Sequence, residues 1–306
     1  MVNSATFERV KVWFAETRPQ FLLLTPVCVF AGVAVSLLDG YAFRLLYFVL
    51  AFIGALCAHV AVNVLNDYFD YRSGVDLRTQ RTPFSGGSGI LPSMQLSPKG
   101  VLLLGLASLG IVLLVGAYFI FVYRWGILPI GLTGVLVILL YTPYLTKLPA
   151  TSEAAAGGFA LMVLGTYFTQ TGTYSFAAAL VTLIAGLLIA NLLLLNEFPD
   201  VEADLVGGRR HLPIILGRRK ASRVYCAITA LAYAILVGGV AGNILPWTAL
   251  FGLVTLPLSL KAMRGSLEHH DEIDRLVPSL AANVLVVLLT PFLMSFGILI
   301  WALLQG

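Results

Sequence analysis

Two short segments of this chain share one pattern: an asparagine, an acidic residue, an aromatic residue, any residue and an aspartate. They are Asn66–Asp70 and Asn196–Asp200. Each closes a long apolar run, and each is followed by a further aspartate, Asp76 after the first and Asp204 after the second. Carboxylates crowded at the end of a membrane span are costly unless a cation neutralises them. Brought together, the two segments would therefore form a divalent-metal site for an anionic ligand.

Oxygen atoms are the only ligands that these segments offer, which favours magnesium. Mg²⁺ binds through one or two carboxylates together with substrate phosphates and retained waters. No histidine or cysteine accompanies the acids at zinc spacing. In a helix the asparagine and the last aspartate of each motif share a face, although Pro199 is expected to bend the second turn. The candidate metal ligands are Asn66, Asp67, Asp70, Asp76, Asp200 and Asp204.

Basic residues are interleaved with these acids, and they predict a diphosphate as the anionic ligand. Guanidinium and ammonium groups beside carboxylates that hold a metal are suited to phosphate recognition. The alternative is that basic residues in the loops only anchor them to anionic lipid, and this stays open above all for Arg218–Lys220. We expect the diphosphate to be bound by Arg72, Arg81, Arg209 and Asn196, with Lys147 adding positive charge.

The elements that must position these residues are membrane helices. Of the 306 residues, 59% are apolar and 11% are charged, whereas soluble domains carry roughly 25% charged residues. A soluble chain of this length could not bury so much apolar surface, and no run shows the alternation of a membrane β-strand. Nine runs approach or exceed the ~20 residues that cross the hydrocarbon core as a helix. They are 21–38, 42–66, 101–123, 126–145, 154–170, 176–196, 221–240, 245–263 and 280–304.

The distribution of lysine and arginine tests this count of nine transmembrane helices. With nine spans and a cytoplasmic N-terminus, all of the 19 basic residues fall on the cytoplasmic side except Arg44 and Arg124. This is a strong positive-inside bias, and moving the frame by one helix would destroy it. The net charge of +4 therefore reflects topology and needs no nucleic-acid partner. We predict an all-α integral protein of the cell membrane whose polar chemistry faces the cytoplasm.

The chain is predicted to be a single domain, residues 1–306, built from two similar halves. The motifs lie in the long cytoplasmic links after the second and the sixth predicted helix. Helices one to four and five to eight would then form two four-helix pseudo-repeats, with a ninth helix added, and such repeats usually place their site where they meet. Residues 1–20 carry Phe7, Val10 and Phe14 near helical spacing, which predicts an interfacial helix. A disordered tail is the alternative.

Two further features carry weaker signals. The segment Thr82–Pro92 holds three glycines and would suit closure over a phosphate, although a plain linker has the same composition. Glu153 opens the fifth predicted helix, where the helix dipole favours a carboxylate. A role in holding a polar acceptor is the alternative. Cys28, Cys57 and Cys226 lie within predicted spans and indicate neither a disulfide nor a metal site.

Over nearly the whole chain these features resemble the UbiA superfamily of intramembrane prenyltransferases. Within it, both motifs fit the 1,4-dihydroxy-2-naphthoate prenyltransferases of menaquinone synthesis. The matching positions are Asn66, Asp67, Asp70, Gly74 and Asp76, then Asn196, Asp200, Asp204, Gly208 and Leu212, with Arg18–Pro19 and Leu216–Gly217 outside them.

The resemblance implies Mg²⁺-dependent transfer of a polyprenyl group from a prenyl diphosphate to an aromatic acceptor, first of all 1,4-dihydroxy-2-naphthoate. Arg209 stands where lysine is usual in this branch, and His211 where threonine is usual. These departures leave 4-hydroxybenzoate, homogentisate and a glycerol-phosphate lipid as alternative acceptors. The isoprenoid would lie among apolar helices open to membrane lipid. The residues expected to act in the reaction are Asp70, Asp200, Lys147 and Tyr144, the last as a ring face for an allylic cation.

An ion-coupled transporter that uses buried acids as an ion path is the competing class. It would place its charges at the bilayer midplane between broken helices. The acids of this chain lie instead at the ends of spans, with basic partners beside them. A transferase that uses a CDP-alcohol would require an Asp-Gly-x-x-Ala-Arg pattern, which this chain lacks.

Overall fold

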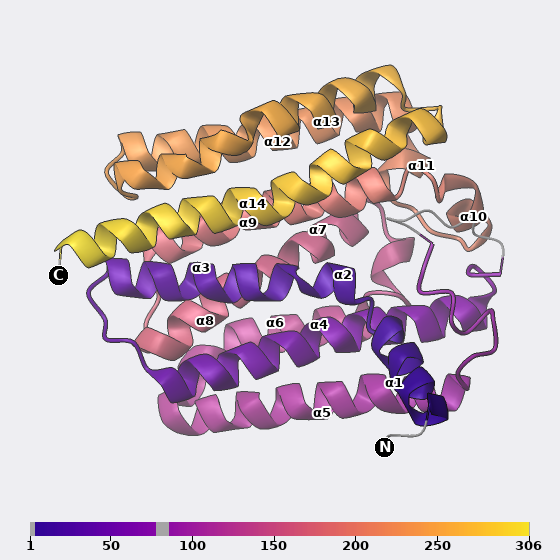
Figure 1. The fold of residues 1–306 in the computed structure, drawn as a ribbon, viewed down its shortest axis with the longest axis horizontal. Coiled ribbons are helices and arrows are strands. Elements are labelled where there is room, and N and C mark those ends of the chain that lie inside the picture. The colour runs from indigo at the N-terminus through magenta and orange to yellow at the C-terminus, as the bar shows by residue number, and fades with distance from the viewer. Residues whose placement is uncertain (1–3, 78–85, 306) are drawn as a thin grey trace.

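The first half of the chain is mainly helical in the computed structural model, which describes residues 4–77 and 86–305 (Figure 1). Its elements are α1 (Ser4–Glu16), α2 (Pro19–Leu22), α3 (Leu24–Leu38), α4 (Leu45–Ser73), α5 (Pro98–Tyr123), η1 (Arg124–Ile127), α6 (Leu128–Leu140) and η2 (Leu145–Lys147). The 3₁₀ turns η1 and η2 flank α6, and η1 joins it directly to α5.

The second half is also helical, but its apolar runs are more often interrupted. Its elements are α7 (Thr151–Gly157), η3 (Gly158–Ala160), α8 (Leu161–Thr171), α9 (Phe176–Asn196), α10 (Val201–Val206), α11 (Leu212–Leu216), α12 (Arg218–Ala241), η4 (Trp247–Thr255), α13 (Leu256–Glu268) and α14 (Ile273–Gln305). Within the described residues there is no β-strand in either half, so the predicted all-helical fold is confirmed for that part of the chain.

Six segments are long and apolar enough to cross a membrane, which makes this an integral membrane protein. The other apolar runs are divided by 3₁₀ turns: η3 separates α7 from α8, and η4 precedes α13. The predicted count of nine helices therefore rests on these shorter pieces and stays a prediction. The six candidate spans of the described residues are Pro19–Leu38, Leu45–Ser73, Pro98–Leu140, Phe176–Asn196, Arg218–Ala241 and Ile273–Gln305.

The main core lies between α3, α8, α9, α12 and α14. α14 packs along α3 and η4, while α9 packs along α12. Glycines allow this close approach, because a β-carbon on Gly32 would collide with the carbonyl oxygen of Val163, and one on Gly297 with that of Thr248. Side chains that fill the interior include Tyr167, Ile184, Leu188, Leu236 and Met294.

The helix ends that carry the two motifs lie at the same end of the bundle, on the right of Figure 1. α4 and α9 both end there, and α1, α10 and α11 gather around them. α1 crosses this end with Phe7, Val10 and Phe14 exposed, as an interfacial helix requires. On the other flank, α4 packs along α5 and α6, whereas α5 and α6 hardly touch one another. The bundle thus brings the two halves together at one polar end.

Candidate functional site

The first motif occupies the end of α4 and the turn that follows. The side-chain amide of Asn66 donates to Asp70 at 2.9 Å, the i, i+4 pairing expected on a helix, and to the hydroxyl of Thr142 at 3.1 Å. Gly74 ends the helix with φ 79° in the left-handed region, which suits glycine. The turn brings the amide of Asp76 to 3.4 Å from the carbonyl oxygen of Asp70. Both carboxylates are buried.

The second motif is divided between two helices. α9 ends at Asn196, Pro199 lies in the turn, and α10 begins at Val201, so the predicted bend is present. Asp204 on α10 is buried. The side-chain oxygen of Asn196 is also buried and has no hydrogen-bond partner among the described residues. Buried polar atoms are nearly always satisfied, so this oxygen is a candidate ligand for a metal ion.

Arg209 connects the two motifs. Its Nη1 donates to Oδ1 of Asp204 at 2.8 Å, and its Nη2 donates to Oδ1 of Asp70. Burial opposes the charge of this guanidinium, but the two carboxylates outweigh that effect and raise the pKa of Arg209 above its ordinary value. Segments far apart in the sequence therefore meet at one partly buried cation.

Arg18 is a second, partly buried guanidinium, which the residue pattern did not single out as a site residue. It forms an ion pair with Asp67, and its Nη2 donates to Oδ1 of Asn66 at 3.3 Å. Burial lowers its pKa, and nearby carboxylates oppose that shift. Its backbone has φ 54°, a left-handed conformation that is uncommon for residues other than glycine. The available sequence signal was its place directly before Pro19, at the start of the first span.

The glycine-rich loop covers the first motif, as far as its described part shows. The amide of Ser88 donates to Oδ2 of Asp67 at 3.0 Å, and its hydroxyl donates to Glu16 at 2.9 Å. Gly87 has φ 72°, and a β-carbon there would lie 3.0 Å from Oδ1 of Asp76. The loop thus depends on glycine for its close approach to the carboxylates. The preceding part of the predicted loop, up to residue 85, lies outside the described residues.

A cavity of 230 Å³ lies between the two motifs. Along α4 its wall changes from Asp70 and Asn66 to Val62 and His59, so one end is charged and the other mainly apolar. Such a cavity suits a ligand with an anionic head and an apolar body. The wall includes Arg18, Asn66, Asp70, Asp76, Tyr141, Phe159, Ile189, Asn196, Asp200, Asp204, Arg209 and His211.

The donor atoms fit a magnesium ion that is held jointly with its ligand. Within residues 4–77 and 86–305, no three acidic, histidine or cysteine side chains are grouped closely enough to hold a metal by themselves. Arg18 and Arg209 pair with the carboxylates instead. Mg²⁺ uses few carboxylates and completes its shell with phosphate oxygens and waters. An incomplete, all-oxygen set beside the unpaired amide oxygen of Asn196 matches that requirement.

Several predicted residues lie away from the cavity. Lys147 and Tyr144 are exposed, and neither lines the cavity in the described structure. Arg72 is exposed and donates to a neighbouring tyrosine hydroxyl at 3.2 Å. Arg81 lies outside the described residues. Tyr141, at the start of the same polar segment, does line the cavity, as do the aromatic side chains of Phe21 and Phe159.

A buried cluster of acids and a histidine adjoins the second motif. His211 Nε2 lies 2.7 Å from Oδ2 of Asp204, and its Nδ1 lies 3.8 Å from Oε2 of Glu197. Glu153 accepts a hydrogen bond from the amide of Leu212 at 2.6 Å. Burial, followed by the nearby Glu153 carboxylate, raises the pKa of Glu197 well above its ordinary value. Glu153 therefore joins α7 to the start of α11, a contact that its place at a helix start did not reveal.

Comparisons with known proteins show the family and the fold of this chain. The sequence model described as "UbiA prenyltransferase family" matches residues 25–283. A 1,4-dihydroxy-2-naphthoate octaprenyltransferase of Bacillus subtilis is 29% identical over 93% of this chain and 91% of its own. A digeranylgeranylglyceryl phosphate synthase of Thermococcus kodakarensis is 28% identical, covering 70% of this chain and 72% of its own. A solved UbiA homolog from Archaeoglobus fulgidus, bound to GPP and Mg²⁺, has a similar fold, with TM-score 0.62, 15% identity, and coverage of 94% of this chain and 99% of that one.

Proposed function

We propose, from the premise that this chain belongs to the UbiA prenyltransferase family, that it transfers a polyprenyl group from a prenyl diphosphate to 1,4-dihydroxy-2-naphthoate with the help of Mg²⁺. The observation that carries this proposal is the convergence of two aspartate motifs on one cavity of 230 Å³. Arg209 joins the motifs by pairing with Asp70 and Asp204. The Bacillus relative, named for octaprenyl transfer to the same acceptor, supports the choice of acceptor.

The diphosphate would lie between the motifs, where buried carboxylates and guanidiniums alternate. When bound there, Mg²⁺ would act as a Lewis acid on the departing pyrophosphate. Arg18 and Arg209 would add positive charge beside it from positions that are already fixed by ion pairs. The Archaeoglobus homolog, solved with GPP and Mg²⁺, supports this assignment. The residues that would hold the ion are Asn66, Asp70, Asp76, Asp200 and Asp204, which line the cavity, with Asn196 adding an amide oxygen. Asp67 does not line the cavity but pairs with Arg18 beside it, and it would join them once the ion is bound.

The reaction would break the bond between the allylic carbon and the diphosphate oxygen, whose electron pair leaves with pyrophosphate. An electron-rich ring carbon of the acceptor then forms the new C–C bond, and carbon dioxide is lost when the acceptor is the naphthoate. Tyr141 is the aromatic residue of the cavity wall that would stabilise the allylic cation. The apolar end of the cavity, around Val62 and Ile189, would exclude water that would otherwise quench it.

A glycerol-phosphate lipid is the alternative acceptor that one comparison supports. The Thermococcus relative is named for the synthesis of digeranylgeranylglyceryl phosphate. 4-Hydroxybenzoate and homogentisate are the other aromatic candidates. The cluster of Glu153, Glu197 and His211 lies on the side of the cavity formed by the second motif, and its polar groups would meet the oxygen atoms of whichever acceptor binds there.

We also propose nine membrane spans, with the N-terminus and the active site on the cytoplasmic side. Six segments qualify by length, of which Pro98–Leu140 would form two spans, α5 and α6. α7 with α8 and η4 with α13 would supply the other two. The positive-inside rule supports this orientation, because Arg209, Arg210 and Arg218–Lys220 lie at the end of the bundle that carries the motifs. An ion-coupled transporter would instead place its acids at mid-span.

Product analysis with the purified protein tests the proposed reaction. The protein in detergent is given octaprenyl diphosphate, Mg²⁺ and each candidate acceptor in turn. We expect a prenylated 1,4-dihydroxynaphthalene, pyrophosphate and carbon dioxide, and no product when EDTA is present. Asp200→Asn should abolish the product, whereas Asp271→Asn, in an exposed loop, should not. Prenylation of another acceptor alone would reject the naphthoate, and ion uptake by liposomes without any product would support the transporter.

A further inference from the structure

His59 is a buried histidine inside a membrane helix. Of the four histidines of the chain, it is the one that lies within a candidate span of the described residues, and it is 4% exposed. Ionisable side chains within membrane helices are costly, so they usually face the interior of the bundle or a polar cavity and serve a function. A histidine at this position therefore indicates a ligand.

The face of α4 that carries His59 also carries the first aspartate motif. At about 3.6 residues per turn, Asn66 and Asp70 follow His59 by nearly whole turns, so each projects within about 20° of its direction. All three side chains line the cavity of 230 Å³. Along the helix axis His59 lies about 10 Å from Asn66, at about 1.5 Å per residue. The histidine therefore belongs to the wall of the candidate site, about two turns deeper in the bundle than the motif.

Two contacts hold the imidazole ring of His59. The hydroxyl of Thr25 on α3 lies 2.9 Å from its Nδ1, and Thr25 is fully buried. The ring of Phe159 in η3 meets the imidazole edge to face, with centroids 4.9 Å apart. Nε2 has no hydrogen-bond partner within residues 4–77 and 86–305. Because one nitrogen fixes the orientation of the ring, the other is available to a ligand.

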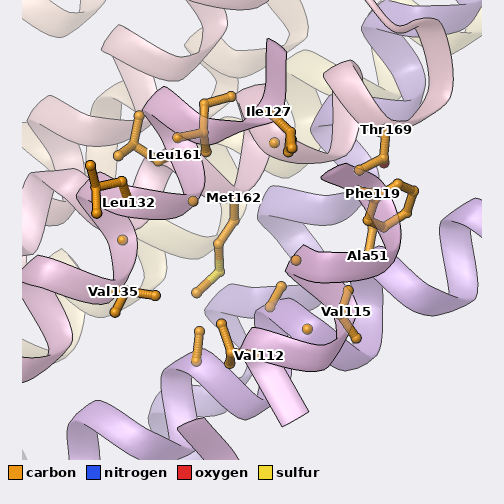
Figure 2. A pocket seen from close by; sticks show the side chains of 18 of the residues that line it. Ala51, Val112, Val115, Phe119, Ile127, Leu132, Val135, Leu161, Met162 and Thr169 are labelled. Atoms are coloured by element: carbon orange, nitrogen blue, oxygen red, sulfur yellow. The ribbon is translucent and has the colours of Figure 1, made fainter. Parts of the chain in front are cut away.

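The ring of Phe159 lies between the polar cavity and a second, apolar cavity of 390 Å³, which is bounded by α4, α5, α6 and α8 (Figure 2). In that view Val112, Val135 and Met162 point toward one another across the apolar cavity. No charged side chain and no histidine among the described residues lines it. Phe159 lines both cavities, whereas His59 lines the polar one alone. A ligand of His59 must therefore bind in the cavity that the two motifs share.

Of the two proposed substrates, only the acceptor can pair with Nε2 of His59. The polar atoms of a prenyl diphosphate all belong to its diphosphate, which the motifs would hold, and its hydrocarbon chain would leave Nε2 without a partner. Buried polar groups are nearly always hydrogen-bonded, because an unpaired one is costly. The hydroxyl of an aromatic acceptor both donates and accepts, so it suits either tautomer of the imidazole. Apolar side chains such as Val62, one turn along α4, line the same cavity and suit an aromatic ring.

We propose that His59 recognises the aromatic acceptor, through a hydrogen bond between its Nε2 and a hydroxyl group of the acceptor ring. The acceptor then lies between α4 and α9, where Val62 and Ile189 line the cavity. The bond fixes the direction of the ring relative to the diphosphate and makes the site selective for a hydroxylated acceptor. This inference rests on the proposed function, because it names a residue that binds the acceptor of that reaction.

Steady-state kinetics of two His59 variants test this role. His59→Leu removes the ring nitrogen, whereas His59→Gln keeps a hydrogen-bonding group. We expect KM for the acceptor to rise about tenfold or more in His59→Leu and less in His59→Gln, while KM for the prenyl diphosphate stays at the wild-type value in both. Cys57→Leu is the matched control, because Cys57 lies on the same helix and lines neither cavity. A wild-type acceptor KM in His59→Leu, or an equal rise in both KM values, would overturn the inference.

Binding of acceptor analogues separates recognition from packing. The protein is loaded with Mg²⁺ and a non-hydrolysable prenyl diphosphate, and is titrated without oxygen with 1,4-dihydroxy-2-naphthoate and with the two monohydroxy-2-naphthoates that lack one hydroxyl or the other. Binding is measured because the hydroxyls also activate the ring for reaction. The wild type should bind one analogue about tenfold or more weakly, and His59→Leu should lose this preference. A histidine that only packs would weaken all three compounds equally when it is replaced.

The wild type alone already provides one decisive result, which does not depend on the folding of a variant. Equal affinity of the wild type for the three compounds would overturn the inference, as would a preference that persists in His59→Leu. Thermal unfolding without ligand checks that each variant is folded. Failure of the wild type to prenylate any acceptor would instead reject the proposed function, so the two failures are distinguishable.

Discussion

Arg209 and Asp70 form an ion pair across the cavity, although one follows the second aspartate motif and the other ends the first. The same guanidinium donates to Asp204 at 2.8 Å. α4 and α10 are thus joined through a buried cation at the point where we place the diphosphate. Carboxylates that are neutralised in this way can remain buried until a ligand and its metal ion arrive.

Removal of this cation should damage both binding and stability. In Arg209→Gln, Asp70 and Asp204 lose their shared partner, so we expect a loss of about 3–5 kcal/mol in the free energy of unfolding and a large rise in KM for the prenyl diphosphate. Arg209→Lys keeps the charge and should retain more activity. Arg210→Gln, its exposed neighbour, is the control. Chemical denaturation and steady-state kinetics measure these effects, and a wild-type KM in Arg209→Gln would contradict the assignment.

Arg18 should matter as much as the motif residues, although it lies outside both. Arg18→Gln leaves Asp67 buried beside a neutral side chain. We expect a fall in unfolding free energy of about 3 kcal/mol together with weaker diphosphate binding, and neither effect in the exposed control Arg9→Gln. Because the pair is buried, the effect should persist at high salt. Wild-type affinity in the Arg18 variant would show that this residue is only structural.

The contact of the glycine-rich loop with Asp76 can be separated from backbone strain. Gly87 and Gly40 both have positive φ, 72° and 80°, but only a β-carbon on Gly87 approaches the site, at 3.0 Å from Oδ1 of Asp76. Both alanine variants should therefore lose about 1–2 kcal/mol of stability, while Gly87→Ala alone should raise KM for the prenyl diphosphate. Chemical denaturation and steady-state kinetics of Gly87→Ala and Gly40→Ala measure the two effects. Equal KM values for the two variants would show that the loop does not form part of the prenyl diphosphate site.

Much of the fold followed from the sequence because apolar runs and charge bias constrain membrane helices strongly. Five of the six long spans each overlap one predicted run, and Pro98–Leu140 covers most of two, 101–123 and 126–145. The run 154–170 did not appear broken, yet η3 divides it at the adjacent glycines Gly157 and Gly158, which favour helix poorly. A β-carbon on Gly157 would lie 3.0 Å from the carbonyl oxygen of Gly186. This requirement of packing between α7 and α9 cannot be read from one segment alone.

The site residues that share one helix could be predicted from their spacing. Those that reach the site through tertiary contacts could not. The pairing of Asn66 with Asp70 follows from the i, i+4 rule. Arg18 reaches Asp67 only because the chain turns between α1 and α2. The sequence gives no reason to prefer Tyr141 over Tyr144, but the turn around η2 places the half-buried Tyr141 at the cavity and exposes Tyr144.

Glu197 should make stability depend on pH. Its pKa is raised by burial and by Glu153, so above the ordinary value of 4.5 the folded state holds a proton that the unfolded state has released. The free energy of unfolding then falls as pH rises through this window. Glu197→Gln replaces the titrating carboxyl group with a neutral amide, so the unfolding free energy of this variant should fall less than that of the wild type between about pH 5 and about pH 8. Denaturation at several pH values measures this, with exposed Glu268→Gln as control, and equal slopes would contradict it.

The central claim is that both aspartate motifs hold one diphosphate between them. Isothermal titration of a non-hydrolysable prenyl diphosphate, with Mg²⁺ present, measures this directly in the wild type and in Asp70→Asn, Asp200→Asn and the exposed control Asp271→Asn. We predict that either motif variant weakens binding by about tenfold or more, since each removes a charged ligand of a shared site, while the control binds as the wild type does. Wild-type affinity in either Asp70→Asn or Asp200→Asn would contradict the account.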